Sequence, residues 1–376
     1  MERYLNKFIA EDLNEKMVFL GGPRQVGKTT VALHLLGNAT EKHPAYYNWD
    51  FIKAQKSLLA GELPAHEPLI VLDEIHKYKK WRNLVKGFYD QYKSEKRFLV
   101  TGSSRLDYYR RGGDSLQGRY HYHRLHPLSL FEINHTPTVS DLKTLMTFGG
   151  FPEPFLRANT RHYRRWQHER ITRVVQEDLL NLERVNEISQ INLLVSLLPD
   201  RVGSPLSINN LRQDLSVAFE TAERWIKILE NLYYCYRITP YGLPHLRAAK
   251  KEKKLYLWDW SLCEREPVLF ENLVASHLLK YCHFQEDVHG EAMELKFIRD
   301  SQRREIDFVV TKNKKPLFGV ECKTGEQSLS TNITYFSRVT NIPIFYQAHL
   351  GQKDYEVRAS RARVLPFITM CQELKL

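Results

Sequence analysis

The sequence has few cysteines and no long apolar run. No two of its five cysteines form a C-x-x-C pair; they are Cys235, Cys263, Cys282, Cys322 and Cys371. This spacing argues against a disulfide framework and against a zinc site, and it fits a reducing cytosol. No apolar run approaches the ~18 residues that a membrane-spanning helix needs, and the first residues form a charged segment rather than a signal peptide. We therefore expect a cytoplasmic protein without a membrane partner.

Length and charge narrow the class of protein further. The chain has 376 residues, of which 43% are hydrophobic, and this length allows two or three packed domains. The formal net charge is +11 and the pI is about 9.2. A basic excess favours an acidic partner, and nucleic acid is the first candidate.

A glycine-rich stretch near the N-terminus predicts a nucleotide site. The pattern G-x-x-x-x-G-K-T follows the apolar run 17–20 and precedes an apolar helical pattern at 31–36. Its glycines let backbone N–H groups surround phosphate oxygens, and the helix start adds its positive dipole end. The alternative is a glycine turn that happens to carry Lys-Thr. The residues predicted to bind the nucleotide are Gly22, Pro23, Arg24, Gln25, Val26, Gly27, Lys28, Thr29 and Thr30.

A second apolar run, 68–72, ends in Asp73 and Glu74. This order is the Walker B pattern of P-loop ATPases, in which Thr29 and Asp73 would hold Mg²⁺ and Glu74 would orient or deprotonate the attacking water. An exposed acidic turn is the alternative. The next predicted strand, 97–101, runs into Ser103, which we expect either to sense the γ-phosphate or to cap a helix.

Several further motifs occur in order along the chain: L-D-E-I-H-K, T-G-S-S, S-L-Q-G-R, H-P-L-S-L-F-E and G-G-F-P-E. Together with the P-loop they resemble a bacterial and archaeal AAA+-type ATPase family whose members carry a C-terminal domain of unknown function. The resemblance implies that Arg119, in S-L-Q-G-R, is an arginine finger or phosphate sensor. Arg119 could equally form a structural ion pair. A finger acting in trans implies a homo-oligomer, for which a hexamer is one arrangement.

The middle of the chain is helical. Residues 126–190 match the lid that follows an AAA+ core, interrupted at 149–152. Arg161, Arg164, Arg165 and His168 fall on one helix face, which is either a phosphate-binding stripe or a solvated or inter-subunit face. Residues 191–250 predict a winged helix with helices at about 207–215 and 220–232. The second helix is expected to expose Glu220, Glu223 and Glu230, which makes DNA binding and protein contact equally good interpretations. The basic run 250–254 either contacts phosphates or is a solvated loop.

The last part of the chain changes to mixed α/β character. Three strand candidates, 294–300, 304–310 and 316–323, follow a helix around 270–279 and precede a helix at 331–339 and a strand at 342–346. Asp307, Glu321 and Lys323 form the D…E-x-K pattern of the PD-(D/E)XK nuclease fold, which this region resembles. Two carboxylates can hold Mg²⁺, and Lys323 would stabilise charge on the phosphate.

In that fold the preceding helix often adds an acidic ligand, and Glu271 matches its position. Arg303 and Arg304 lie close enough in sequence to help bind phosphate. The site is either a competent nuclease, which the intact residues favour, or a structural remnant.

We therefore predict an α/β protein with four segments: a P-loop AAA+-type ATPase core (1–125), a helical lid (126–190), a winged helix (191–250) and a PD-(D/E)XK nuclease-like domain (251–376). The expected cofactors are ATP and Mg²⁺, with Mn²⁺ as an alternative at the nuclease site. The expected partner is nucleic acid, with DNA favoured. The predicted function is ATP-controlled DNA processing, including branched or structured DNA. The alternative is an ATP-switched DNA-binding, defence or signalling protein with an inactive nuclease-like domain.

Overall fold

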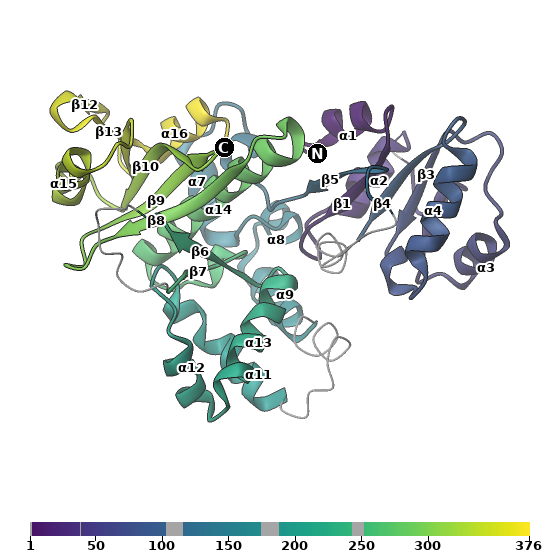
Figure 1. Cartoon of the computed structure of the whole chain (residues 1–376), viewed down its shortest axis with the longest axis horizontal. Coiled ribbons are helices and arrows are strands. Elements are labelled where there is room, and N and C mark those ends of the chain that lie inside the picture. Colours follow the sequence, from purple (N-terminus) through teal and green to yellow (C-terminus); the bar gives the residue numbers. More distant parts are fainter. Residues whose placement is uncertain (1, 38, 103–115, 174–187, 243–251) are drawn as a thin grey trace. The chain divides into compact units, whose positions relative to one another are not determined.

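The computed structural model describes residues 2–37, 39–102, 116–173, 188–242 and 252–376 (Figure 1). By its internal contacts the chain forms two compact units, Met1–Pro127 and Leu128–Leu376. The predicted end of the ATPase core lies beside this division. Each unit is described by itself below.

The first unit alternates strands and helices, as a parallel α/β sheet requires. Its elements are α1 (Asn6–Asp12), β1 (Met17–Gly21), α2 (Lys28–Leu35), β2 (Tyr46–Asn48), α3 (Ile52–Ala60), β3 (Leu69–Asp73), η1 (Ile75–Lys77), α4 (Trp81–Tyr92), β4 (Arg97–Thr101) and β5 (Tyr120–Arg124). The apolar runs that predicted strands are β1, β3 and β4, and the helix-period segment before β4 is α4.

All neighbouring strands of this sheet are parallel, in the order β2-β3-β4-β1-β5. Every residue of β1 is buried, as expected for a central strand covered on both faces. The strands β1, β3 and β4 end at one edge of the sheet. The glycine loop follows β1, Asp73 is the last residue of β3, and Thr101 is the last residue of β4. In open α/β sheets this edge is where ligands bind.

The second unit begins with helices and ends in a mixed sheet. Its helices are α6 (Leu130–Ile133), α7 (Val139–Phe148), α8 (Pro152–Arg157), α9 (Thr160–Arg173), α11 (Ile188–Leu197), η4 (Pro199–Arg201), α12 (Ile208–Leu215), α13 (Phe219–Asn231), η5 (Trp260–Leu262), α14 (Glu266–His289), α15 (Thr331–Val339), η6 (Arg358–Ser360) and α16 (Phe367–Leu374). Its strands are β6 (Cys235–Pro240), β7 (Lys254–Leu257), β8 (Met293–Arg299), β9 (Glu305–Lys312), β10 (Lys315–Lys323), β11 (Phe345–His349), β12 (Tyr355–Val357) and β13 (Ala362–Pro366).

These strands form one sheet in the order β12-β13-β11-β10-β9-β8-β6-β7. The strands β8, β9 and β10 are antiparallel, and α15 connects β10 to the parallel strand β11. The predicted order of helix, three strands, helix and strand is therefore present. The strand predicted from Ile342 begins later, at Phe345, because Pro343 cannot donate a hydrogen bond to the sheet.

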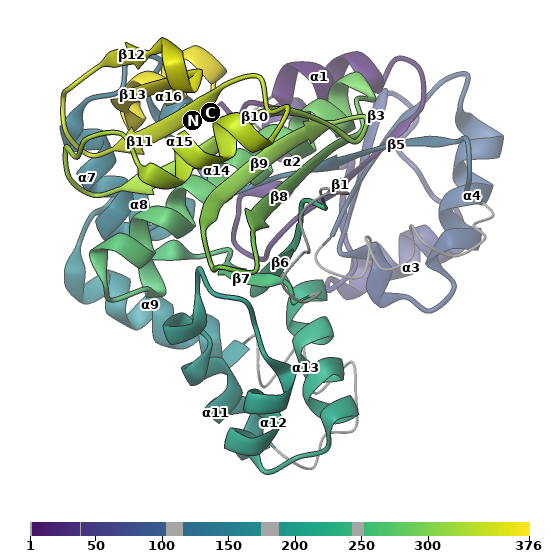
Figure 2. The same cartoon turned by 60° about the vertical axis from the view of Figure 1, so that its left-hand side comes forward.

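Helices cover both faces of this sheet (Figure 2). Phe308 and Val310 of β9 pack in one core with α14, whereas Val309 packs in another with Ile333 and Phe336 of α15. Successive residues of a strand point to opposite faces, so α14 and α15 lie on opposite sides. Both helices begin near the end of the sheet where the predicted nuclease residues lie.

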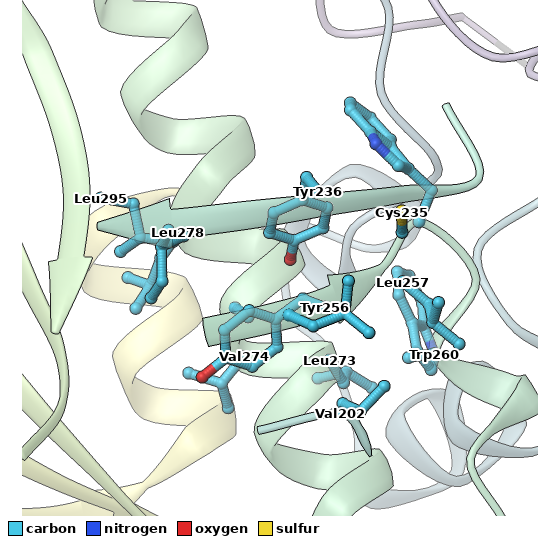
Figure 3. Packing of buried hydrophobic residues seen from close by; sticks show 14 of the residues in the cluster. Val202, Cys235, Tyr236, Tyr256, Leu257, Trp260, Leu273, Val274, Leu278 and Leu295 are labelled. Carbon is cyan, nitrogen blue, oxygen red and sulfur yellow. The ribbon is translucent and has the colours of Figure 1, made fainter. Parts of the chain in front are cut away.

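The predicted winged-helix segment has its expected helices. In α13 the apolar side chains Ala222, Trp225, Ile226 and Leu229 are buried, as an amphipathic helix predicts. Ser207 caps α12 by accepting from the Asn210 N–H at 3.4 Å. Strand β6 pairs with β7 and also with β8, so it continues the C-terminal sheet. Tyr236 of β6 and Tyr256 of β7 pack over α14 in one core (Figure 3). The segment is thus joined to the sheet that follows it, and its assignment as a winged helix stays a prediction.

The predicted lid segment also contributes to the core of the second unit. The Leu130 N–H donates to Nε2 of His277 at 3.0 Å, and the Trp260 indole N–H donates to the Leu145 carbonyl at 2.9 Å. A buried ion pair joins Glu132 to Lys280 of α14. None of the described helices has the length and apolar character needed to span a membrane.

Candidate functional site

The backbone of the glycine loop between β1 and α2 has positive φ angles at three residues. Gly22 and Gly27 have φ of 141° and 101°, and Gln25 between them has φ 62°. A Cβ at Gly22 would lie 2.4 Å from the Leu125 carbonyl oxygen, so only glycine fits there. Pro23 and Val26 are buried, whereas Arg24, Gln25 and Thr29 are partly exposed and Thr30 is exposed.

Lys28 is the first residue of α2 and is buried. Its ammonium donates to the carbonyls of Gly22 at 2.9 Å and Pro23 at 2.7 Å. The ammonium therefore lies against the first residues of the loop, whose backbone groups are predicted to surround a phosphate. In P-loops the lysine of this motif reaches the β/γ-phosphates, so Lys28 stays predicted to bind the nucleotide.

Asp73 is the centre of a hydroxyl cluster and is 2% exposed. One of its oxygens, Oδ2, accepts from Thr29 Oγ1 at 3.0 Å and from the Tyr46 hydroxyl at 2.5 Å. The other, Oδ1, accepts from Thr101 Oγ1. Burial, followed by the charge of Asp73, raises the pKa of Tyr46 above its ordinary value, so Tyr46 remains a hydrogen-bond donor.

Tyr46 and Thr101 were missed by the sequence reasoning, which chose Ser103 as the polar residue after β4. Ser103 lies outside the described residues. One feature of the sequence could have identified Thr101: it is the last residue of a strand that was expected beside the strand ending in Asp73. The register pairs Thr101 directly with Asp73.

Glu74 follows in a left-handed backbone conformation, with φ 55°. Its Oε2 lies 3.5 Å from Lys77 Nζ and 3.6 Å from His76 Nε2. Burial raises the pKa of Glu74, while the nearby charge of Lys28 lowers it, and the net direction is upward. A carboxylate with a raised pKa beside the phosphate loop suits a proton acceptor for an attacking water.

The N-terminal segment braces the loop, which the sequence did not predict. The guanidinium of the buried Arg3 donates to the carbonyls of Val26 and His126, each at 2.6 Å. The Tyr4 hydroxyl donates to the Arg124 carbonyl at 2.8 Å. These bonds tie the loop to the chain segment that ends the first unit.

Arg119 forms an exposed ion pair with Asp90, with Nε 2.9 Å from Oδ1. This contact is the structural alternative that the sequence left open. An exposed pair contributes little to stability, so Asp90 does not prevent Arg119 from acting on a neighbouring protomer.

In the second unit, the fold brings Glu271, Asp307, Glu321 and Lys323 into one cluster. Glu271 lies on α14, Asp307 on β9, and the other two on β10. The β9–β10 ladder ends at the pair Phe308–Val320, one step before Asp307, and Oδ2 of Asp307 accepts from the Cys322 N–H at 2.8 Å. Lys323 donates to Oε1 of Glu321 at 2.9 Å.

Lys254 also belongs to this cluster, and the interpretation of 250–254 as a phosphate-contacting or solvated run is wrong for this residue. Lys254 is the first residue of β7 and is 0% exposed. Its Nζ lies 2.5 Å from Glu305, 3.2 Å from Glu271 and 3.7 Å from Asp307. Burial alone would lower the pKa of Lys254, but the three carboxylates raise it, so the residue is a cation.

Glu321 is 4% exposed, and its Oε2 is buried without a hydrogen-bond partner among the described residues. Burial and the charge of Asp307 raise the pKa of Glu321 above its ordinary value, and the same two causes raise that of Glu271. Such carboxyls are stabilised as anions by a nearby cation.

The fit of these residues to a divalent metal is uneven. Asp307 and Glu321 keep free acceptor positions, and the orphan Oε2 suits a metal ligand. Glu271 fits poorly, because its Oε1 accepts from both the Tyr256 hydroxyl at 2.8 Å and the Lys254 ammonium. In the part of the chain that the structure describes, no group of three or more His, Cys, Asp or Glu side chains is arranged to hold a metal ion.

The basic residues proposed for nucleic acid differ in their surroundings. Arg161, Arg164, Arg165 and His168 are exposed along α9, opposite the buried Trp166 and Arg170. Arg304 instead bonds to Asp300 at 2.7 Å and stacks on Tyr335, while Arg303 is exposed. Two acidic residues of α13 that were expected to face solvent, Glu223 and Glu230, both bind the buried guanidinium of Arg237.

Comparison with protein families gives three matches along the chain. Residues 14–134 match an AAA domain, residues 139–266 a domain of unknown function (DUF8612), and residues 268–369 a second domain of unknown function (DUF4143). The first match contains the glycine loop, Asp73 and Glu74. The other two divide near the start of α14.

Curated relatives are distant and uncharacterized. Proteins of Mycobacterium tuberculosis and Mycobacterium bovis are each 26% identical over 251 residues, which is 66% of this chain and 55% of theirs. The chain thus spans about half the length of these relatives. A protein of Methanocaldococcus jannaschii is 22% identical over 347 residues, covering 75% of this chain and 71% of its own.

Solved structures with partial similarity include the Thermotoga maritima RuvB Holliday junction branch migration motor, at 17% identity and a TM-score of 0.29 over 67% of this chain and 90% of that one. A signal transduction ATPase with numerous domains from Pyrococcus horikoshii has 12% identity and a TM-score of 0.22 over 77% and 48%. TM-scores this low carry no weight for function. The AAA-domain match, the glycine loop and the parallel sheet together support an AAA-type P-loop ATPase fold for the first unit.

Proposed function

We propose that the first unit binds ATP with Mg²⁺ and hydrolyses it. The observation that carries this proposal is the hydrogen bond of 3.0 Å between Thr29 and Asp73, formed beside the ammonium of Lys28 at the loop head. Thr29 and Asp73 would hold Mg²⁺, which supplies charge neutralisation at the β/γ-phosphates. Lys28 would stabilise the phosphate charge.

Glu74 would accept a proton from the attacking water or orient it toward the γ-phosphate. It follows β3 in a left-handed backbone conformation, and its raised pKa favours proton uptake. Arg119 would complete the site of a neighbouring protomer, so the active form would be a homo-oligomer. Cleavage of the terminal P–O bond by water would yield ADP and inorganic phosphate.

A steady-state ATPase assay tests this proposal. Lys28→Ala should lower kcat/KM about 100-fold or more, whereas the exposed Lys53→Ala in the same unit should leave it unchanged. Glu74→Gln should bind ATP and fail to hydrolyse it. Turnover retained by Lys28→Ala, or nucleotide affinity lost in Glu74→Gln, would defeat the assignment.

A second function is favoured by the carboxylate cluster of the second unit. We propose that this unit is a metal-dependent nuclease, acting on DNA under the control of the ATPase, with branched or structured DNA as candidate substrates. The supporting observation is the buried, unpartnered Oε2 of Glu321 beside Asp307 and Lys323. A bound Mg²⁺ or Mn²⁺ would polarise the scissile phosphate, and Lys323 would stabilise charge on its oxygens.

A panel of linear, single-stranded and branched DNA, incubated with Mg²⁺ or Mn²⁺ and with or without ATP, tests the nuclease. Asp307→Asn and Lys323→Met should each abolish metal-dependent cleavage, and Lys315→Met at the exposed start of β10 is the control. Cleavage that survives both changes would belong to a contaminant. DNA binding without cleavage would favour the alternative, an ATP-switched binding or defence protein with an inactive nuclease-like domain.

A further inference from the structure

The carboxylate cluster already contains a cation of its own, the ammonium of Lys254. Its Nζ lies within salt-bridge distance of Glu271, Glu305 and Asp307, at 3.2, 2.5 and 3.7 Å. These carboxylates come from α14 and β9, whereas Lys254 comes from β7 at the far edge of the sheet. One buried lysine therefore joins two elements whose side chains would otherwise repel one another.

A lysine is almost never fully buried without paired charges, because removing an ammonium from water is costly. Three carboxylates offset that cost here. At distances near 3 Å, each attraction is far stronger in a buried site than in water. The phenyl ring of Phe297, 5.6 Å from Nζ, adds a further favourable contact. The surroundings of Lys254 thus stabilise its positive charge.

Neighbouring groups fix Glu271 toward this lysine. The Tyr256 hydroxyl, two residues along β7, donates to the same Oε1 at 2.8 Å. A Cβ at Gly203 would lie 3.1 Å from both carboxylate oxygens, so the chain passes close against this carboxylate. Oε1 of Glu271 is thereby engaged by both the tyrosine bond and the lysine contact.

The other side of the cluster has a different character. Oε2 of Glu321 is buried and unpartnered, and Oδ2 of Asp307 bonds only a backbone N–H among the described residues. Carboxylate oxygens have two acceptor positions each, so both residues can still ligate a hard cation. Lys254 touches Asp307 at 3.7 Å and has no ion pair with Glu321 among the described residues.

We propose that Lys254 is the resident cation of this cluster, which withholds Glu271 and Glu305 from metal coordination and leaves Asp307 and Glu321 as the carboxylate pair that binds one divalent ion. The nuclease pattern places Glu271 in the metal set, whereas its Oε1 is bonded by Lys254 and Tyr256. The inference refines the proposed nuclease site and takes its biological meaning from that proposal. Its test reads metal binding, so the absence of DNA cleavage would not decide it.

The experiment is a Mn²⁺ titration of the nucleotide-free full chain, followed by the electron paramagnetic resonance signal of free Mn²⁺. All proteins carry Asp73→Asn, so that metal at the ATP site does not contribute. In this parent, Glu271→Gln should change the Mn²⁺ dissociation constant less than about twofold. Asp307→Asn and Glu321→Gln should each weaken it at least about tenfold, as expected on losing a charged ligand.

Lys254→Met supplies the converse result. Removing the ammonium frees Glu271, while Glu305 keeps its ion pair with Arg299, so Mn²⁺ should bind at least about tenfold more tightly. Adding Glu271→Gln to Lys254→Met should reverse most of that gain. Lys253→Met, the exposed neighbour, should leave binding as in the parent. A parent that binds no Mn²⁺ would contradict the assignment of Asp307 and Glu321 as the metal-binding pair.

Two further affinity results would overturn the proposal. The first is a loss of Mn²⁺ affinity in Glu271→Gln as large as that in Glu321→Gln. The second is an unchanged affinity in Lys254→Met. If that variant does not fold, Lys254→Met/Glu305→Gln removes one charge of each sign and takes its place, with the same gain expected. A melting scan of each variant with and without Mn²⁺ checks folding. Absence of a Mn²⁺-dependent shift in Lys254→Met/Glu305→Gln would also refute the proposal.

Discussion

The Thr101 hydroxyl donates a hydrogen bond to Oδ1 of Asp73 from the neighbouring strand, where the two residues are directly paired. Thr29 donates to the other oxygen of the same carboxylate at 3.0 Å. The two oxygens of Asp73 are therefore held by different elements, one by Thr101 at the end of β4 and the other by Thr29 of α2. Changes at Thr101 should reach the ATP site through this carboxylate.

Thr101→Val tests that link, because it removes the hydroxyl and keeps the side-chain volume. We expect kcat for ATP hydrolysis to fall about tenfold, with the KM for ATP changed less than about threefold, since the hydroxyl positions Asp73 rather than binding nucleotide. Steady-state kinetics at saturating Mg²⁺ measure both constants. Tyr46→Phe removes another donor to Asp73 and should act in the same direction. An unaltered kcat in both variants would show that these hydroxyls only stabilise the fold.

Arg3 should matter for nucleotide affinity although it lies far from the loop in sequence. Its guanidinium bonds the carbonyls of Val26 and His126, each at 2.6 Å. Arg3→Ala should raise the KM for ATP about five- to tenfold and cost about 1–3 kcal/mol of stability, because two carbonyls lose their donor. Lys7→Ala on α1 is the control, since Lys7 forms an exposed pair with Glu11. Equal KM values in the two variants would contradict a bracing role for Arg3.

Arg119 offers a test of assembly. If it acts in trans, Arg119→Ala should be inactive alone, and mixing it with Lys28→Ala should restore activity, because mixed oligomers contain intact sites. Asp90→Ala breaks the ion pair seen at 2.9 Å and should keep ATPase activity. Native mass measurement with and without ATP follows the oligomer. Failure of complementation, with Asp90→Ala as impaired as Arg119→Ala, would identify a structural pair.

The sequence predicted what depends on local pattern. Continuous apolar runs became the buried strands β1, β3 and β4, and the D…E-x-K spacing brought Glu321 and Lys323 to one cluster with Asp307. These predictions succeed because strand burial and side-chain alternation are properties of a few consecutive residues.

The sequence could not predict pairings between distant elements. Lys254 stood in a basic run that resembled a solvated loop, and only the meeting of β7, β9 and α14 shows why it is buried. Arg237 is a second example, because it forms ion pairs with Glu223 and Glu230, which were expected to be exposed on α13. A charged residue is expected to be exposed until its partners are placed, so partners from other elements escape a prediction made segment by segment.

His277 predicts a pH dependence of stability. It is buried, its Nε2 accepts from the Leu130 N–H at 3.0 Å, and burial lowers its pKa to about 3. The unfolded chain protonates this histidine near its ordinary pKa of about 6.5, whereas the folded chain does not. Below that pH the unfolded state binds more protons, so stability falls as the pH falls, by at most about 1.4 kcal/mol per pH unit.

Urea unfolding at pH 7, 6, 5 and 4 measures this effect. Other buried groups titrate in the same range, so the informative quantity is the difference between the wild type and His277→Gln, which lacks the ionisable ring. The wild type should lose stability faster below about pH 6.5. Parallel curves for the two proteins would mean that the folded state accommodates a protonated His277.

The exposed basic face of α9 is the expected contact for the proposed DNA partner. Arg161, Arg164 and Arg165 share this face and have no ion pair among the described residues, whereas α13 presents only Arg224 and Lys227 beside acidic neighbours. Replacing the three α9 arginines by glutamine should weaken DNA binding in fluorescence anisotropy. It should also reduce the slope of log affinity against log salt by about 0.9 for each phosphate that the variant no longer neutralises. Arg224→Gln/Lys227→Gln should change neither by as much. The reverse order would place DNA on α13, the second helix of the predicted winged helix, and equal small effects would leave α9 as a solvated face.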